Sequence, residues 1–317
     1  MKKRKNDLIQ LGILIVLGVL VILSLTLPQF SQERSRPQPL SLSILIRDSD
    51  SSLWTNARLG MEQAADELGA ELRFLTLSEA NFAQEQQTLF LQEIEDGADA
   101  IIVSPADPEA LSQALSSLEN SCPVIAMESP IEGASGLIAP DDDLLGRELA
   151  QALLEDWTGG TVLLLDTAGP RTAISRRLQS AQETLSAAGV PTVTRTTVSQ
   201  AVTSVLNGLL AETGSSYVMT FEASATLAAA QGSEYWSISP ALYGVGSSSA
   251  ITTRLDSGII TAVAAWSDYA AGYLAVEQCV SEVLEHQTAP DPLTFFILRG
   301  EDIYEPKNQK LLFPVIS

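Results

Sequence analysis

The sequence predicts an α/β protein with two units of mostly parallel sheet, preceded by one N-terminal transmembrane helix. Three observations support this prediction. Short apolar runs alternate with amphipathic helical patterns from about residue 42 onward, the alternation restarts after residue 139, and an uncharged apolar segment lies near the N-terminus. Strands separated by single helices need crossover connections, which produce parallel sheets covered on both faces.

The N-terminal segment consists of a basic tip at 1–7, an apolar run at 8–27 and a proline-rich polar tether at 28–40. About 20 uncharged residues are enough for a helix to span ~30 Å of hydrocarbon. The basic residues before the run place the N-terminus in the cytoplasm and the folded part, from residue 41 to 317, outside the cell membrane. The run is longer than a typical signal-peptide core and lacks a small-x-small cleavage site, so we expect a single-pass signal anchor, with cleavage as the alternative.

The composition limits the classes of function. The chain has 317 residues and a formal net charge of −21. Such an acidic surface repels nucleic acid, so we expect no nucleic-acid partner. The only histidine is His286, which argues against histidine-based catalytic triads, and no Cys/His spacing indicates a metal or another cofactor. Cys122 and Cys279 are either a disulfide pair of an extracytoplasmic protein or buried apolar side chains.

The first unit begins with an apolar strand at 42–46, followed by a polar loop that ends in Leu53 and Trp54. The helical pattern after this loop stops at Gly69, a typical helix end. A strand that passes through a short loop into a helix is where open parallel sheets hold ligands. Trp54 therefore either offers a flat apolar face to a ligand or closes the top of the core.

The remaining elements follow in order. In the first unit we expect strands at 72–77, 98–104, 123–127 and 136–139, and helices at 84–96 and 111–118. In the second unit we expect strands at 161–166, 192–197, 217–221, 241–245 and 259–265, and helices at 144–155, 173–188, 203–212, 225–231 and 252–257. A long helix at 268–286 and a last strand at 293–298 complete the chain. Asp141, Asp142 and Asp143 favour a helix N-terminus over a metal site, since acidic side chains complement the helix dipole.

Six segments in this order resemble the type I periplasmic binding proteins, specifically the ribose-binding-protein-like sugar-binding family. They are SLWTNARLGMEQAADELGAEL, DGADAIIVSPADPEAL, CPVIAMES, LIAPDDDLLGRELA, TAISRRLQSA and LDSGIITAVAAWSDYAAGYLAVE, and the resemblance covers about 41–310. It implies two Rossmann-like lobes joined by a three-crossover hinge, which close on a small ligand. Lobe one is then about 42–139 plus 266–290, and lobe two about 141–263 plus 293–317.

The resemblance also implies a set of ligand-binding positions. These are Asp50, Ser51, Leu53, Trp54, Glu128, Ser129, Arg177, Phe221, Glu222, Gly246 and Trp266. Several differ from the sugar-reading pattern: Ser129 replaces an arginine, Phe221 and Glu222 replace an Asn-Asp pair, and Gly246 replaces an aspartate. A sugar in such a site loses hydrogen-bond partners, which is costly when buried. Trp54, Phe221 and Trp266 suit an aromatic-stacked ligand, and Glu128, Glu222 and Asp268 suit a cationic one. In the remaining alternative, Phe221 and Trp266 only pack the lobes together.

The function implied by the resemblance is a membrane-tethered extracytoplasmic protein that clamps a small ligand, sugar-like by family default, for an ABC permease. Two alternatives stay open: a module that presents ligand occupancy to a membrane histidine kinase or chemoreceptor, and a clamp that has lost its ligand. We expect no enzyme, because the chain lacks G-x-S-x-G, a P-loop and a G-x-G-x-x-G after a strand. Acid–base chemistry by Glu128 and Glu222 on a glycoside is the enzymatic alternative.

Overall fold

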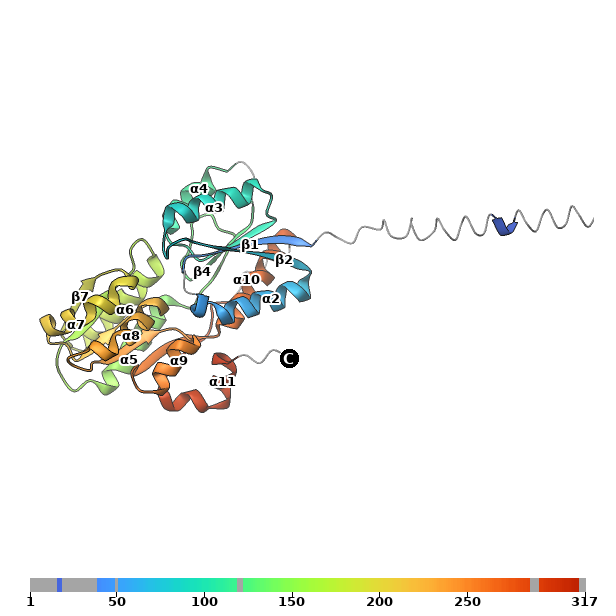
Figure 1. Ribbon diagram of the computed structural model, residues 1–317. Coiled ribbons are helices and arrows are strands. Elements are labelled where there is room, and N and C mark those ends of the chain that lie inside the picture. The colour runs from blue at the N-terminus through green and yellow to red at the C-terminus, as the bar shows by residue number, and fades with distance from the viewer. Residues whose placement is uncertain (1–15, 19–38, 49–50, 119–121, 286–290, 314–317) are drawn as a thin grey trace, which may run out of the picture. The chain divides into compact units, whose positions relative to one another are not determined.

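The computed structural model of the chain describes residues 16–18, 39–48, 51–118, 122–285 and 291–313 (Figure 1). Residues Leu40–Ser317 form one compact unit, separate from Met1–Pro39. The predicted transmembrane span at 8–27 lies outside the described residues except for 16–18, which are helical, and the tether lies outside them up to residue 38. Within the described parts of the chain, no helix has the length and apolar character needed to cross a bilayer.

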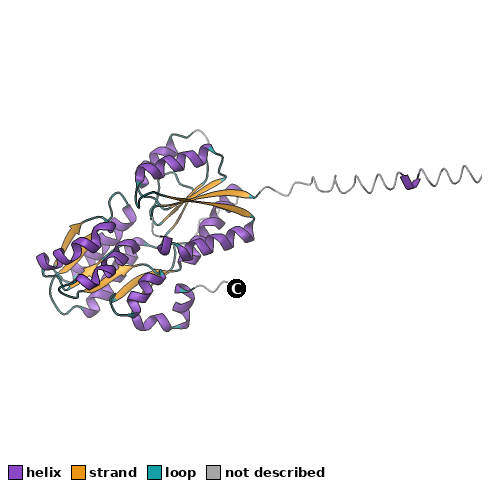
Figure 2. Cartoon of the chain, in the orientation of Figure 1, coloured by secondary structure: helices purple, strands orange, loops and turns teal. Residues whose placement is uncertain are grey.

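Lobe one contains a five-stranded sheet, and Figure 2 draws the strands in orange with purple helices on both sides. The strand order is β2-β1-β3-β4-β5, with every neighbouring pair parallel. Its strands are β1 (Leu40–Ile46), β2 (Ala70–Thr76), β3 (Ala100–Val103), β4 (Val124–Met127) and β5 (Gly136–Ile138). Helices α2 (Thr55–Leu68) and α10 (Asp268–Val283) cover one face, and α3 (Ala83–Glu95) and α4 (Pro108–Ser116) cover the other. Side chains alternate accordingly: Leu42 and Ile44 pack toward α2 and α10, whereas Leu45 packs toward α3 and α4.

Lobe two contains a six-stranded sheet in the order β11-β10-β9-β8-β6-β7. Its strands are β6 (Val162–Asp166), β7 (Thr192–Thr196), β8 (Tyr217–Met219), β9 (Ala241–Val245), β10 (Ala262–Trp266) and β11 (Phe295–Leu298). Helices α5 (Asp142–Asp156) and α6 (Thr172–Ala187) cover one face, and α7 (Val202–Thr213), α8 (Ala223–Gln231) and α9 (Ser249–Asp256) cover the other. The two-lobed α/β architecture with parallel sheets is thereby confirmed, with one exception: β11 runs antiparallel to β10.

Short helical segments complete the described chain. They are the 3₁₀ turns η1 (Ser51–Leu53), η2 (Ser199–Ala201), η3 (Gly232–Tyr235) and η4 (Gly300–Tyr304), and the terminal helix α11 (Pro306–Leu312). The helix ends follow from the sequence. The N–H of Gly69 donates to the carbonyl of Ala65 at the end of α2, and Asp141 accepts from the N–H of Leu144 at 2.9 Å at the start of α5.

The lobes are joined where the chain passes from β5 to α5, from β10 to α10 and from α10 to β11. Two of these segments pair with each other: Pro140 and Leu293 form a parallel bridge, and the Leu293 N–H donates to the Ala139 carbonyl at 2.9 Å. One apolar cluster extends through both lobes and includes Cys279, which is fully buried. Cys279 and Cys122 are both free thiols in the structure, which therefore contains no disulfide between them. The predicted buried apolar role holds for Cys279, whereas Cys122 is only half-buried.

Candidate functional site

The carboxyl ends of the strands in the two lobes face each other and carry charged side chains. In lobe one, Arg47 follows β1 and Glu128 follows β4. In lobe two, Glu222 follows β8 and Arg171 precedes α6. This edge of a parallel sheet is where α/β proteins bind ligands, because the loops there leave the sheet together.

Arg47 lies at the centre of this group and contacts both lobes. Its Nη1 donates to Ser104 Oγ at 2.7 Å and forms an ion pair with Glu128, within lobe one. Its Nη2 lies 3.3 Å from Glu222 Oε2, across the junction in lobe two. The Arg47 side chain is 4% exposed and that of Glu222 is 1% exposed, so this interlobe ion pair is buried.

Glu222 also binds a second arginine. Arg171 Nη1 lies 2.5 Å from Glu222 Oε2 and its Nη2 lies 3.3 Å from Oε1, a two-point pairing of guanidinium and carboxylate. Burial disfavours the charged form of Glu222, but Arg171 and Arg47 outweigh it and hold the pKa of this carboxyl below its ordinary value. Glu222 therefore stays ionised at neutral pH.

Glu128 has a strained backbone and a stabilised charge. Its φ of 66° lies in the left-handed region, which is costly for a side chain with a Cβ and is found most often at functional positions. Burial opposes ionisation of Glu128, while Arg47 and Arg177 favour it, and the net effect lowers its pKa. The carboxylate at this strained position forms its ion pair with Arg47.

Arg177 lies behind the cleft wall. Its Nε donates to Asp142 Oδ1 at 2.7 Å, its Nη1 donates to the Phe221 carbonyl at 3.1 Å, and its guanidinium lies 5.4 Å from the ring centre of Trp266. With 1% of its side chain exposed, Arg177 supports the Trp266 indole and the end of β8 from inside lobe two.

A cavity of about 40 Å³ remains between the lobes beside Arg47. Its polar wall consists of Arg47, Asp48, Glu128, Ser224, Ser247, Ser248 and Asp268. Its apolar wall includes Leu53, Trp54, Met127, Ile138 and Trp266. Ligand pockets usually measure about 300–1,000 Å³, and one water needs roughly 10–15 Å³, so the cavity has room for a few waters and not for a sugar ring.

Asp268 is a carboxyl group of this wall with a strongly perturbed titration. Burial raises its pKa to about 7, and the charge of Glu128 adds to this rise, against the Ser247 hydroxyl that donates to it at 2.5 Å. Asp268 begins α10 in lobe one and Ser247 follows β9 in lobe two, so this hydrogen bond also connects the lobes.

The structure brings together many of the predicted site residues. Five of them line the cavity: Leu53, Trp54, Glu128, Gly246 and Trp266. Glu222 does not line the cavity itself but forms an ion pair with Arg47, which does. Trp54 is also held in place, since its Nε1 donates to Asp48 Oδ2 at 3.2 Å. Gly246 has a φ of +129°, and a Cβ there would lie 2.5 Å from the Ile251 side chain, so this position accepts only glycine without rearrangement.

Other predicted residues lie elsewhere. The side chain of Phe221, two residues after β8, is fully buried in the core and is not part of the cavity wall. Its carbonyl accepts a hydrogen bond from Arg177. Ser129 is 2% exposed and is not part of the described cavity wall. Asp50 lies outside the described residues, and Ser51 begins η1.

Sequence reasoning missed Arg47 and Arg171. Arg47 directly follows the apolar run of β1, and Arg171 lies in the loop between β6 and α6. For Arg47 the available signal was a charged residue immediately after a buried strand, because such residues collect at the ligand-binding edge of a parallel sheet. Arg171, which directly precedes a helix, had no such signal.

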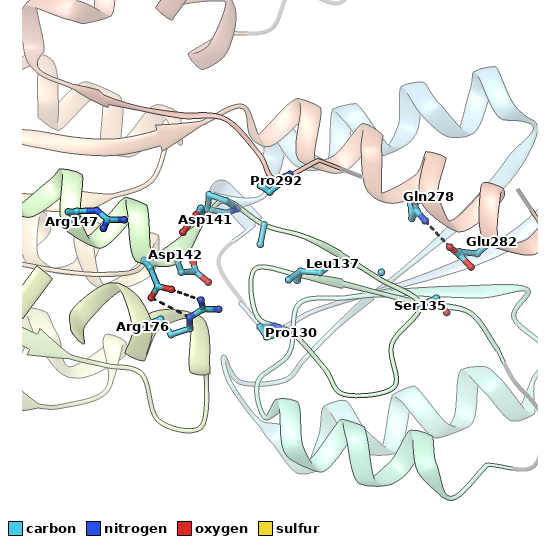
Figure 3. Close-up of a pocket in the computed structure, with 14 residues that line it drawn as sticks. Pro130, Ser135, Leu137, Asp141, Asp142, Arg147, Arg176, Gln278, Glu282 and Pro292 are labelled. Carbon is cyan, nitrogen blue, oxygen red and sulfur yellow. Dashed lines mark hydrogen bonds and ion pairs between the residues drawn. The ribbon is translucent and has the colours of Figure 1, made fainter. Parts of the chain in front are cut away.

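A second, larger hollow of about 1030 Å³ lies beside the interlobe segments (Figure 3). Its walls include Leu137 of β5 and Arg147 of α5, with Pro292 on the segment that leads to β11. One pair of its charged groups lies near solvent. Arg176 and Asp143 lie 2.5 Å apart with about half of each side chain exposed. Such solvated pairs hold a ligand weakly, so the charged cleft around Arg47 is the better candidate site.

Comparisons with known proteins agree with the two-lobed fold. A family model described as a periplasmic binding protein domain matches residues 42–286. No curated protein sequence matches the chain.

Solved structures match over most of the compact unit. A solute-binding protein of an ABC transporter from Agrobacterium vitis, with bound D-fucose, is 15% identical with a TM-score of 0.79 and aligns over 86% of this chain and 100% of its own. The periplasmic component of an ABC-type sugar transport system from Hahella chejuensis is 22% identical with a TM-score of 0.74, over 81% and 99%. The XylFII-LytSN complex contains a chain that is 16% identical with a TM-score of 0.73, over 84% and 100%. At these identities the likeness concerns the fold.

Proposed function

Because this chain belongs to the periplasmic binding protein domain family, we propose that it is an extracytoplasmic binding protein that clamps a small polar molecule between its two lobes without transforming it. One observation carries the proposal: charged side chains from both lobes, Arg47 and Glu128 from one and Arg171 and Glu222 from the other, converge at the carboxyl ends of the two sheets. Clamping closure around a ligand between two lobes is a common use of such a junction.

The chemistry of the cleft supports a ligand rich in hydrogen-bonding groups. Guanidinium groups only donate and carboxylates only accept, so the site offers both kinds of partner. The indoles of Trp54 and Trp266 add apolar faces. Sugars fit this description, and the similar protein from Agrobacterium vitis contains D-fucose. The carboxyl groups of Glu128, Asp48 and Asp268 also suit a cationic ligand.

The location and partner extend the proposal. The uncharged run at 8–27 supports a signal anchor that keeps the binding unit at the outer face of the membrane. The ABC transporter proteins among the similar structures support delivery of the ligand to a permease. The second candidate is sensing through a membrane histidine kinase or chemoreceptor, which is favoured by the likeness to XylFII, a protein that is found in complex with LytSN.

A thermal-unfolding screen tests the binding function. The full chain, purified in detergent, is mixed with sugars, polyols, amines and amino acids, and a ligand that binds only the native state raises the melting temperature. A stabilising sugar whose effect disappears in Trp54→Ala but persists in Tyr235→Ala, an exposed aromatic of η3, supports the sugar clamp. Stabilisation by amines alone supports a cationic ligand. If no compound stabilises the chain, the solute-binding proposal is wrong.

A further inference from the structure

We propose that Arg47 is an internal ligand of the interlobe cleft, which holds the lobes closed through Glu222 and yields its place to a small molecule that carries an amine or guanidinium group. The statement on the ligand rests on the proposed binding function, whereas the statement on closure does not.

The first step is the position of the Arg47 guanidinium. It contacts Ser104 and Glu128 of its own lobe and Glu222 of the other lobe, so a single group joins the two carboxylates across the junction. All of these groups are largely shielded from water, and a charge-assisted contact there is stronger than one at the surface. The chain therefore supplies a cation where a ligand's donor groups would meet both lobes.

Further hydrogen bonds connect the lobes around Arg47. Gln200 Nε2 donates to the Ala80 carbonyl at 3.1 Å, next to Asn81, whose N–H donates to the Arg47 carbonyl at 2.8 Å. On another side, Asn56 Nδ2 donates to the Leu312 carbonyl at 3.3 Å. The loop that contains Ala80 and Asn81 is therefore bound both to Gln200 of lobe two and to the backbone of Arg47.

The second step concerns what can replace Arg47. The cavity beside it measures about 40 Å³, so with the lobes closed as they are here a ligand of ordinary size fits only when this side chain moves away. Glu222 would keep Arg171 as its partner, but Glu128 would lose its direct ion pair. A buried carboxylate without a cation is strongly unfavourable, so a neutral sugar is a poor substitute and a cationic group is a good one.

The charge balance of the cleft supports the same conclusion. The carboxyl groups of Asp48, Glu128, Glu222 and Asp268 share two guanidinium groups, those of Arg47 and Arg171. Arg177 also acts on Glu128 through its charge, but its ion pair is with Asp142. The pKa of Asp48 is raised by burial and by the charges of Glu128 and Glu222, although Arg47 opposes this rise. An added cation would relieve this repulsion.

Arg47 is also incompletely bound. Within the described part of the chain its Nε is buried and has no hydrogen-bond partner. An unpaired buried donor weakens the hold of the site on this side chain, which suits a group that must be displaced.

The test measures lobe separation and its chemical rescue. Spin labels are placed at Gln113→Cys on α4 and Gln182→Cys on α6, both exposed positions in different lobes, in full chains whose Cys122 and Cys279 are replaced by alanine. Pulsed dipolar spectroscopy of the detergent-solubilised chain gives the distance between the labels. The parent chain, which carries both labels and no other substitution besides the two alanines, should give one short distance. In Arg47→Ala the ratio of open to closed molecules should increase about tenfold or more, because a charged hydrogen bond between the lobes is lost.

Added methylguanidinium should restore the short distance in Arg47→Ala, and added D-fucose should not. Arg47→Lys keeps the cation and should stay closed, and Arg195→Met, which removes an exposed arginine paired with Glu212 inside lobe two, should match the parent. If Arg47→Ala does not fold, Arg47→Met retains much of the side-chain volume and serves instead.

Two results overturn the inference. If Arg47→Ala and Arg47→Met are as closed as the parent chain, Arg47 does not hold the lobes together. If D-fucose restores the short distance in Arg47→Ala and methylguanidinium does not, the ligand is not cationic. The thermal-unfolding screen tests the binding function separately: if no compound stabilises the wild-type chain, that function is wrong. The distance measurement on Arg47 keeps its meaning in either case.

Discussion

Gly146 of α5 lies directly against the backbone carbonyl of Arg177 in α6. A Cβ built on Gly146 would lie 2.1 Å from that oxygen, far inside van der Waals contact. Arg177 in turn binds Asp142 of α5 and lies over the Trp266 ring. The close approach of the two helices therefore sets the position of one aromatic wall of the cleft.

The first prediction concerns this contact. We expect Gly146→Ala to lower the free energy of unfolding by about 1–3 kcal/mol, because the added methyl forces α5 and α6 apart in a packed core. Gly208→Ala in α7 is the control, since a Cβ there meets no described atom within 4 Å and the position is exposed. It should raise stability by up to about 1 kcal/mol through helix propensity. Urea unfolding of both variants measures the difference, and equal effects would show that the helices can separate freely.

The second prediction concerns the buried pair of Arg177 and Asp142. Arg177→Met leaves Asp142 buried without its counter-ion, so we expect a loss of about 3–5 kcal/mol in the free energy of unfolding at pH 7. The double variant Arg177→Met with Asp142→Asn removes the stranded charge and should recover part of this loss. A double-mutant cycle from urea unfolding measures the coupling, and strictly additive losses would rule it out.

Most of the architecture was predictable from local patterns. Apolar runs and amphipathic stretches predicted the strand observed as β1 and the helix observed as α5, whose N-cap Asp141 was visible in the sequence. The direction of β11 was not predictable in this way. A short apolar run indicates a strand, but its antiparallel pairing with β10 depends on the path of the chain back from α10, which no local pattern contains.

The candidate site was predictable only in part. Resemblance to a family placed Trp54, Glu128 and Trp266 at the cavity, because these positions follow from strand order. Arg47 was missed because an arginine after a strand is usually solvated. Here Arg47 is buried and pairs with Glu222, which lies 175 residues further along the chain and in the other lobe. Only the folded structure brings the two residues together.

The third prediction concerns the two thiols. Burial raises the pKa of Cys122 to about 11 and that of Cys279 well above its ordinary value, so little reactive thiolate exists at neutral pH. We expect slow modification of Cys122 and none of Cys279 by a thiol reagent in the folded chain, and rapid modification of both in 6 M guanidinium chloride. Mass spectrometry of peptides after timed labelling checks this. Failure of both to react in denaturant without reductant would indicate a disulfide instead.

The fourth prediction concerns the pH dependence caused by Asp268. Because burial raises its pKa to about 7, the folded state keeps a proton on Asp268 between about pH 4 and 7 that the unfolded state has already lost. The free energy of unfolding therefore falls as the pH rises through this window, by at most about 1.4 kcal/mol per pH unit for one proton. Glu128 and Glu222 have lowered pKa values, so their contribution is lost only at more acidic pH, as the pH falls.

Asp268→Asn isolates this effect, since asparagine has the same shape and no titrating proton. We expect the stability of the variant relative to wild type to increase from pH 5 to about pH 7 in urea unfolding and to level off toward pH 8. Ser247→Ala removes the hydroxyl that stabilises the Asp268 carboxylate, so its pKa should rise further and the fall in stability should extend to higher pH. A difference between Asp268→Asn and wild type that stays constant across this range would mean that Asp268 is already ionised in the folded protein at pH 5, and that its surroundings stabilise the charge despite burial.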